Sequence, residues 1–141
     1  MVEPVKSIST GTQGARSHVP FAGEQENRPW GYFRVLIRGS GFQVKLLVIN
    51  PGQATSLQFH RHRDEFWFVV DGSPQVLKDS DTFQLNAGGT LAIPKKVTHR
   101  ITVPDGEPQV QIIEVQTGAI ITEEDVVRIA DKYGRHVPRT S

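Results

Sequence analysis

The chain of 141 residues contains no cysteine. This absence excludes disulfide bonds, thiolate-bound metals and a cysteine nucleophile, so a metal ion would need nitrogen and oxygen ligands. Charge of one sign is not in excess: 16 Lys and Arg against 15 Asp and Glu leave a net charge of +1, unlike the broad positive field of a nucleic-acid-binding protein. The sequence also lacks an apolar run near the roughly 18 residues of a membrane span, and its polar start lacks a signal-peptide core. We therefore expect a cytoplasmic protein that binds neither nucleic acid nor membrane.

The length of the chain suits a single folding unit. Residues 1–27 mix Ser, Thr, Gly, Gln and charged side chains without a strand or helix period, and we predict a flexible N-terminal arm there. Residues 28–141 are predicted to form the folded domain. Up to Thr117, short runs rich in Val, Ile, Leu and Phe alternate with turn signals such as Pro51-Gly52 and Asp71-Gly72.

This alternation predicts an all-β domain of eight or nine short strands, arranged as a barrel or jelly roll. The predicted strands cover residues 32–38, 42–50, 56–62, 67–70, 75–78, 82–85, 90–93, 99–103 and 110–116. One short C-terminal helix is predicted after them. Thr122 and Asp125 resemble a capping box, the apolar residues from Val126 to Tyr133 recur at helical spacing, and Gly134 would end the helix.

A set of metal-ligand residue types occurs at regular spacing in the β region. Gln58 and His60 are two apart on a predicted strand and therefore point to the same face. Glu65 can rejoin them after a bend, and His99 opens the strand that follows Pro94. Two imidazoles, one carboxylate and one amide oxygen suit Zn, Mn, Fe or Ni. The sequence thus predicts one divalent metal ion held by Gln58, His60, Glu65 and His99.

The ligands fall in two blocks, from Gly52 to Gly72 and from Gly88 to His99, which resemble the paired motifs of the cupin superfamily. Gln58 stands where the first His of that family is usual. The stretches 28–31, 41–45, 56–63, 113–118 and 131–135 further resemble the type II mannose-6-phosphate isomerase (phosphomannose isomerase) domain. The resemblance covers residues 28–135 and implies a cupin fold, the double-stranded β-helix or jelly-roll barrel. A guanylyltransferase module usually precedes this domain in the family, so we expect the stand-alone form.

The resemblance implies a metal-dependent isomerase that interconverts mannose 6-phosphate and fructose 6-phosphate through an enediol or enediolate, in carbohydrate metabolism and polysaccharide biosynthesis. Zinc is the first choice for the metal. A general base must carry a proton between adjacent carbons, and Glu114, in a late strand that would line the barrel, is the candidate. His62 is an alternative metal ligand or an acid-base group; we favour Gln58 as the ligand.

Cationic side chains in family-like positions are candidates to bind the phosphate or polarise the substrate. We assign Lys45 and Arg63 to catalysis, and Arg100 and Arg135 to substrate binding. Trp30 is a candidate to stack on a sugar ring, although a large aromatic side chain in a barrel more often belongs to the core.

Three residues depart from the family: Lys96 replaces a usual Gly, Val103 a usual Asn, and Phe66 a common His. Because Phe66 exchanges a titratable group for an apolar one, it is expected to alter the pocket.

Two other functions remain open at this point. One is a non-catalytic metal-binding cupin that binds a sugar or sugar nucleotide; the other is a cupin enzyme acting on a different sugar phosphate. The expected partners are a small-molecule sugar phosphate and a second copy of the chain. Small barrels often pair edge strands or exchange an arm, which predicts a homodimer.

Overall fold

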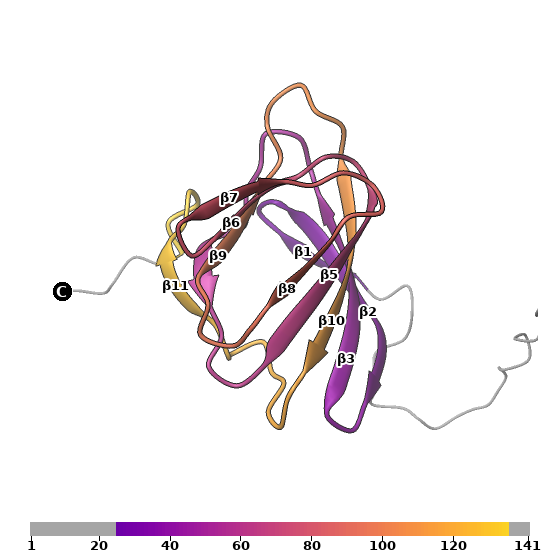
Figure 1. The fold of residues 1–141 in the computed structure, drawn as a ribbon, viewed down its shortest axis with the longest axis vertical. Coiled ribbons are helices and arrows are strands. Elements are labelled where there is room, and N and C mark those ends of the chain that lie inside the picture. The colour runs from indigo at the N-terminus through magenta and orange to yellow at the C-terminus, as the bar shows by residue number, and fades with distance from the viewer. Residues whose placement is uncertain (1–24, 136–141) are drawn as a thin grey trace, which may run out of the picture.

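The computed structural model describes residues 25–135, so most of the predicted arm (residues 1–24) and residues 136–141 lie outside the described part. Within 25–135, eleven strands form two antiparallel sheets that curl around a common interior (Figure 1). The predicted all-β class is confirmed.

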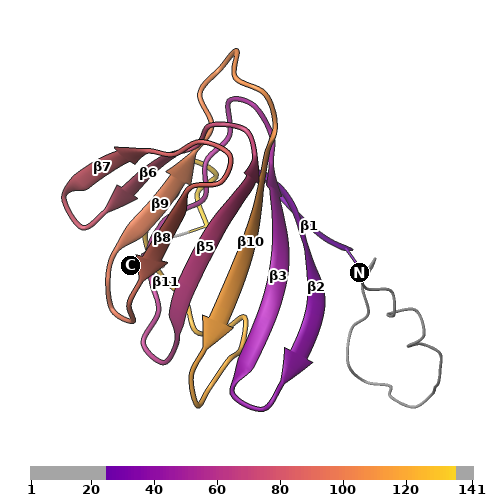
Figure 2. The same cartoon turned by 45° about the vertical axis from the view of Figure 1, so that its right-hand side comes forward.

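The larger sheet has six strands, and β2, β3, β10 and β5 lie side by side in Figure 2. In spatial order it contains β1 (Gln25–Arg28), β2 (Gly31–Gly39), β3 (Phe42–Ile49), β10 (Val110–Thr117), β5 (Asp64–Asp71) and β8 (Thr90–Ile93). The smaller sheet contains β11 (Val127–Ala130), β4 (Leu57–Phe59), β9 (His99–Thr102), β6 (Gln75–Lys78) and β7 (Asp81–Gln84). All nine predicted strands are present; those at 75–78 and 90–93 have the predicted ends and the other seven have shifted ends, whereas β1 and β11 were not predicted.

Alternation along the strands of the six-stranded sheet divides the barrel interior into an apolar and a polar end. The inward-facing, buried residues of β10 are Val110, Ile112, Glu114 and Gln116, in that order. In β3 and β5 the buried side chains also change from apolar to polar near this level, since the register places Lys45 and Trp67 on either side of Glu114. The apolar end forms the core, and the polar end is available for chemistry.

The predicted C-terminal helix is wrong. Residues 122–125 form a turn, in which the Asp125 N–H donates to the Thr122 carbonyl at 3.2 Å, and strand β11 follows. The three-residue strand β4 pairs with β9 on one side, and β11 supplies its partner on the other, with Arg128 opposite Gln58. This pairing provides hydrogen-bond partners for backbone N–H and C=O groups of β4, which would have none there if residues 122–133 formed a helix. Tertiary structure therefore overrides a weak local helix preference. No helix of the described chain could cross a membrane.

The sequence predicted that Phe66 would alter the pocket, but in the structure Phe66 does not line it. It alternates with the buried Glu65 and Trp67 on β5, so its side chain points to the outer face of the six-stranded sheet, where it is 46% exposed. Val103 is fully buried in the core. These two departures from the family therefore lie away from the polar end of the barrel.

Lys96 adopts a left-handed backbone conformation (φ 70°) at the position where the family usually has glycine. This conformation costs about 1–2 kcal/mol for a residue with a Cβ, whereas the greater freedom of glycine in the unfolded chain costs about 0.4–1 kcal/mol. We expect Lys96→Gly to raise the free energy of unfolding by about 0.5–1 kcal/mol in urea denaturation. Lys95→Gly, the matched control without a positive φ, should lower it, and a Lys96→Gly protein less stable than the wild type would contradict the prediction.

Candidate metal centre

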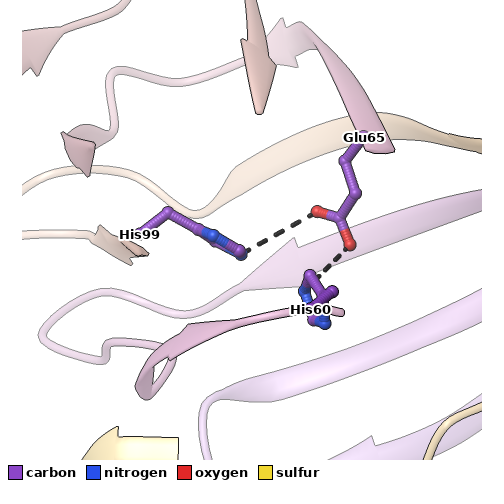
Figure 3. Close-up of side chains that lie close together, drawn as sticks. All are labelled: His60, Glu65 and His99. Atoms are coloured by element: carbon purple, nitrogen blue, oxygen red, sulfur yellow. Dashed lines mark ion pairs between the residues drawn. The ribbon is translucent and has the colours of Figure 1, made fainter. Parts of the chain in front are cut away.

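Three buried side chains converge at the polar end of the barrel: His60 just after β4, Glu65 in β5 and His99 at the start of β9 (Figure 3). One potential ligand atom from each lies within 4.8 Å of the others. The Glu65 Oε2 atom is 3.1 Å from His60 Nε2, and its Oε1 is 3.9 Å from His99 Nε2. Because Glu65 and His99 come from opposite sheets, the centre forms only when the barrel closes.

Backbone carbonyls orient both imidazoles. His60 Nδ1 lies 2.6 Å from the Asp125 carbonyl, and His99 Nδ1 lies 3.0 Å from the Val97 carbonyl. A carbonyl oxygen only accepts, so each Nδ1 carries a hydrogen and each Nε2 is directed at Glu65. Burial lowers the pKa of His99, and the charges of His60 and Arg63 add to this effect. The charge of Glu65 acts in the opposite direction, but the net shift is downward and favours the neutral imidazole of His99. Two imidazoles held through Nδ1, with Nε2 facing a carboxylate, provide nitrogen and oxygen donors of the kind that a divalent transition metal binds.

The Arg63 guanidinium lies beside this cluster and makes three contacts. Its Nε donates to Glu65 Oε2 at 2.9 Å, one terminal nitrogen approaches His60 Nε2 at 3.3 Å, and the other donates to the Thr122 carbonyl at 3.0 Å. Burial lowers the pKa of Arg63, but the charges of Glu65 and Glu114 outweigh it and the net shift is upward. Arg63 thus supplies a permanent positive charge at the centre.

A second buried carboxyl group, that of Glu114, lies next to Glu65. The Trp67 indole N–H is shared between them, 3.0 Å from Glu65 Oε1 and 3.2 Å from Glu114 Oε2. Burial raises the pKa of Glu114 well above its usual range, and the charge of Glu65 adds to this effect. Burial also acts to raise the pKa of Glu65, but hydrogen bonds with Glu114 and His60 outweigh it and hold that pKa well below the usual range. Two neighbouring carboxyl groups with opposite shifts are typical of an acid-base site.

The two candidates for a fourth metal ligand lie in different surroundings. Gln58 lines the same cavity as the cluster and is the register partner of His99 across β4 and β9. His62 is exposed and does not line this cavity, and its backbone N–H donates to Asp125 Oδ2 at 3.0 Å.

Most of the other predicted residues line the same cavity, namely Trp30, Lys45, Arg63, Glu114 and Arg135. The Lys45 ammonium pairs with Glu123 and lies 3.9 Å from the centre of the Phe33 ring. Arg100 does not line the cavity, because it donates to the carbonyls of Thr55 and Ala130.

Two arginines of the cavity, Arg28 and Arg128, were not among the predicted site residues. The Nε of Arg128 is buried and has no hydrogen-bond partner among residues 25–135. Burial, followed by the charge of Arg135, lowers the pKa of Arg128, whereas Arg135 is itself held by Asp131, at 2.8 and 2.9 Å. Asp131 and Glu123 act in the opposite direction, but the net shift is downward, and a buried guanidinium N–H without an acceptor favours a ligand that supplies one. The sequence analysis did not identify Arg128 as a site residue, because its segment was predicted to be a helix and a helix would not pair it with Gln58 across two strands.

Comparison with known proteins gives both a family and a fold. The family model described as mannose-6-phosphate isomerase C-terminal matches residues 17–131. The xanthan biosynthesis protein XanB of Xanthomonas campestris is 42% identical over 108 residues, which are 77% of this chain and 23% of that protein. The mannose-1-phosphate guanylyltransferase of Escherichia coli is 36% identical over 134 residues, 95% of this chain and 28% of that one.

The chain therefore spans about a quarter of the length of these curated relatives. Among solved structures, the Cnp3 cupin domain of Schizosaccharomyces pombe aligns with a TM-score of 0.62 and 14% identity, over 69% of each chain. At this identity the likeness concerns the fold alone, and it confirms the predicted cupin barrel.

Proposed function

Since this chain belongs to the mannose-6-phosphate isomerase C-terminal family, we propose that it is a metal-dependent isomerase that interconverts mannose 6-phosphate and fructose 6-phosphate. The observation that carries the proposal is the pair of neighbouring buried carboxyl groups. Glu65 stays ionised among the imidazoles, while Glu114 favours the protonated form in the same cavity. Metal-assisted transfer of a proton between adjacent carbons needs an acid-base group close to the metal ligands, and these two groups meet that requirement.

His60, Glu65 and His99 would hold the metal ion, with Gln58 as the proposed fourth ligand. Zinc is our first choice, because two imidazoles and a carboxylate are a common ligand set of catalytic zinc sites. When bound, the ion would supply Lewis-acid polarisation of the sugar carbonyl and hydroxyl oxygens. The Asp125 carbonyl and the Arg63 guanidinium keep His60 and Glu65 in position for it.

Glu114 is the proposed acid-base group. Its carboxylate would take the proton from one carbon of the sugar, leaving an enediol or enediolate, and return it to the neighbouring carbon. The proton of the adjacent hydroxyl group would pass to the former carbonyl oxygen by exchange with solvent, which completes the ketose. Lys45 and Arg63 line the same cavity and would stabilise negative charge on the sugar oxygens. Because burial raises the pKa of Glu114, its ionised form is a stronger base than an ordinary carboxylate, and its protonated form can return the proton.

The phosphate of the substrate is proposed to bind Arg128, with Arg28 and Arg135 beside it. We expect Arg128→Gln to raise KM for mannose 6-phosphate about tenfold or more with a smaller change in kcat, since it removes a charge-assisted contact worth about 1.5–3 kcal/mol. Arg100→Gln, outside the cavity lining, is the comparison in steady-state kinetics and should change KM less. An equal rise in KM for both variants would contradict this placement.

The proposed reaction is tested by a coupled assay that detects fructose 6-phosphate formed from mannose 6-phosphate. The purified protein should give a rate that chelation abolishes and a divalent ion restores, and mannose without phosphate should react poorly. A rate no higher than that of the metal-stripped control, across Zn, Mn, Fe and Ni, would refute the proposed activity.

The outer face of the six-stranded sheet supports the proposed homodimer. Ile37, Phe66, Phe68 and Val70 are each 42–52% exposed there, and apolar faces of this kind commonly mark protein contacts. Light scattering should give about twice the chain mass of 15.7 kDa, and a monomeric mass would refute the dimer.

A further inference from the structure

A line of hydrogen bonds runs from the protein surface to Glu114 through the polar end of the barrel. The Arg38 Nε donates to Gln43 Oε1 at 2.6 Å, and Gln43 Nε2 donates to Gln116 Oε1 at 2.9 Å. Gln116 Nε2 in turn donates to Glu114 Oε1 at 3.0 Å. Arg38 is exposed, whereas Gln43 and Gln116 are almost fully buried. We call these three residues the Arg38 chain.

The sheet register builds the chain. Arg38 in β2, Gln43 in β3 and Gln116 in β10 are cross-strand partners, so they form one row across the six-stranded sheet. The next row along β10 contains Glu114 between Lys45 and Trp67. The row of the Arg38 chain therefore lies directly beside the row that carries the proposed acid-base group.

An arginine can only donate, and this sets the direction of the whole chain. The amide oxygen of Gln43 must face Arg38, so its amide nitrogen faces Gln116, and the amide nitrogen of Gln116 faces Glu114. Successive hydrogen bonds of one direction polarise each other. The Oε1 atom of Glu114 is thus always met by a donor, and Oε2 remains as the oxygen on the side of Trp67 and Glu65.

We propose that Arg38, Gln43 and Gln116 are positioning residues that hold Glu114 by its Oε1 atom and leave Oε2 as the oxygen that meets the sugar. This inference rests on the proposed function of Glu114. Gln43 and Gln116 are buried amides, and each accepts from one neighbour in this line through its oxygen and donates to the next through its nitrogen. Their alignment with an exposed, donor-only residue at one end and Glu114 at the other supports a role in orientation.

The test substitutes the exposed end of the chain, where the risk of misfolding is least. Arg38→Met removes the donor, Arg38→Lys keeps one, and Arg34→Met on the same strand is the matched control because Arg34 reaches Gln25 instead. One readout is kinetic. The other is the pair of indole N–H resonances in ¹H–¹⁵N NMR at matched metal content, since the chain has two tryptophans and Trp67 donates to Glu114 while Trp30 serves as the internal reference.

Arg38→Met should shift the Trp67 resonance but not that of Trp30, and lower kcat about tenfold or more with KM little changed, because misplacement of the reacting group mainly affects the chemical step. Arg38→Lys should restore much of kcat, and Arg34→Met should match the wild type. An unmoved Trp67 resonance, or a shifted one with unchanged kcat, would overturn the positioning role. The same comparison with Gln116→Leu should give a larger effect of the same kind.

The two proposals fail in different ways. A wild-type protein that does not isomerise mannose 6-phosphate would refute the proposed function, and the role of the Arg38 chain in that reaction would fall with it. An active wild type whose Arg38→Met and Gln116→Leu variants keep both kcat and the Trp67 resonance would refute the positioning role alone.

Discussion

Replacing His60 by alanine is expected to strip the protein of its metal ion and abolish isomerisation. His60 is one of three buried potential ligands whose ligand atoms lie within 4.8 Å of one another, and the Asp125 carbonyl fixes its ring so that Nε2 faces the cluster. An incomplete set of ligands cannot retain the ion in competition with a chelator. Elemental analysis after dialysis against a weak chelator should find about one equivalent in the wild type and almost none in His60→Ala.

His99→Ala and His62→Ala complete this experiment. The first removes the ligand candidate at the start of β9, in the sheet opposite Glu65, so it should lose the metal to the same extent as His60→Ala. The second tests the alternative fourth ligand, and the exposed position of His62 predicts full metal content. Circular dichroism must report a folded barrel in each case. Full metal occupancy in His60→Ala and His99→Ala would contradict the centre, and metal loss in His62→Ala would favour His62 over Gln58.

Glu114→Gln is expected to lower kcat about 10²- to 10⁴-fold while the metal content and the affinity for the sugar phosphate are kept, because an amide cannot carry a proton between carbons. The amide oxygen of the new side chain can still accept from Gln116, and its nitrogen can face Glu65. Steady-state kinetics, elemental analysis and a binding titration measure the three quantities. The exposed Glu107 on a turn provides the matched control, and Glu107→Gln should change none of them.

The stability of Glu114→Gln follows from the sign of the pKa shift. A carboxyl group whose pKa is raised on folding contributes stability only while it is protonated, and this contribution is lost as pH rises from the unfolded towards the folded pKa. Since burial raises the pKa of Glu114, removing its charge should leave the midpoint of thermal unfolding at neutral pH equal to or above that of the wild type.

Equal activity of Glu114→Gln and wild type would exclude Glu114 as the base. Sugar binding without turnover by either protein would favour the non-catalytic cupin.

The sequence by itself determined the β class and most of the strands. Turn signals such as Asp71-Gly72 and Gly88-Gly89 separate runs of alternating side chains, and that alternation is a local property that each strand keeps in any sheet. The resemblance to the family was likewise visible in local stretches, and the match over residues 17–131 shows it. The spacing of Gln58, His60, Glu65 and His99 identified a set of metal-ligand types that the barrel brings to one cavity.

Only the tertiary structure decided the rest, because it depends on pairing between distant segments. The segment with helical spacing near the C-terminus forms strand β11 instead, because it pairs with the free edge of β4. This pairing places Arg128 opposite Gln58. Burial acts to raise the pKa of both Glu65 and Glu114, and the shifts become opposite because hydrogen bonds with Glu114 and His60 lower that of Glu65, while the charge of Glu65 adds to the rise at Glu114; these contacts join segments that are distant in the sequence. The direction of the Arg38 chain likewise follows from the register of three strands, since side chains far apart in sequence exchange hydrogen bonds only when the sheet aligns them.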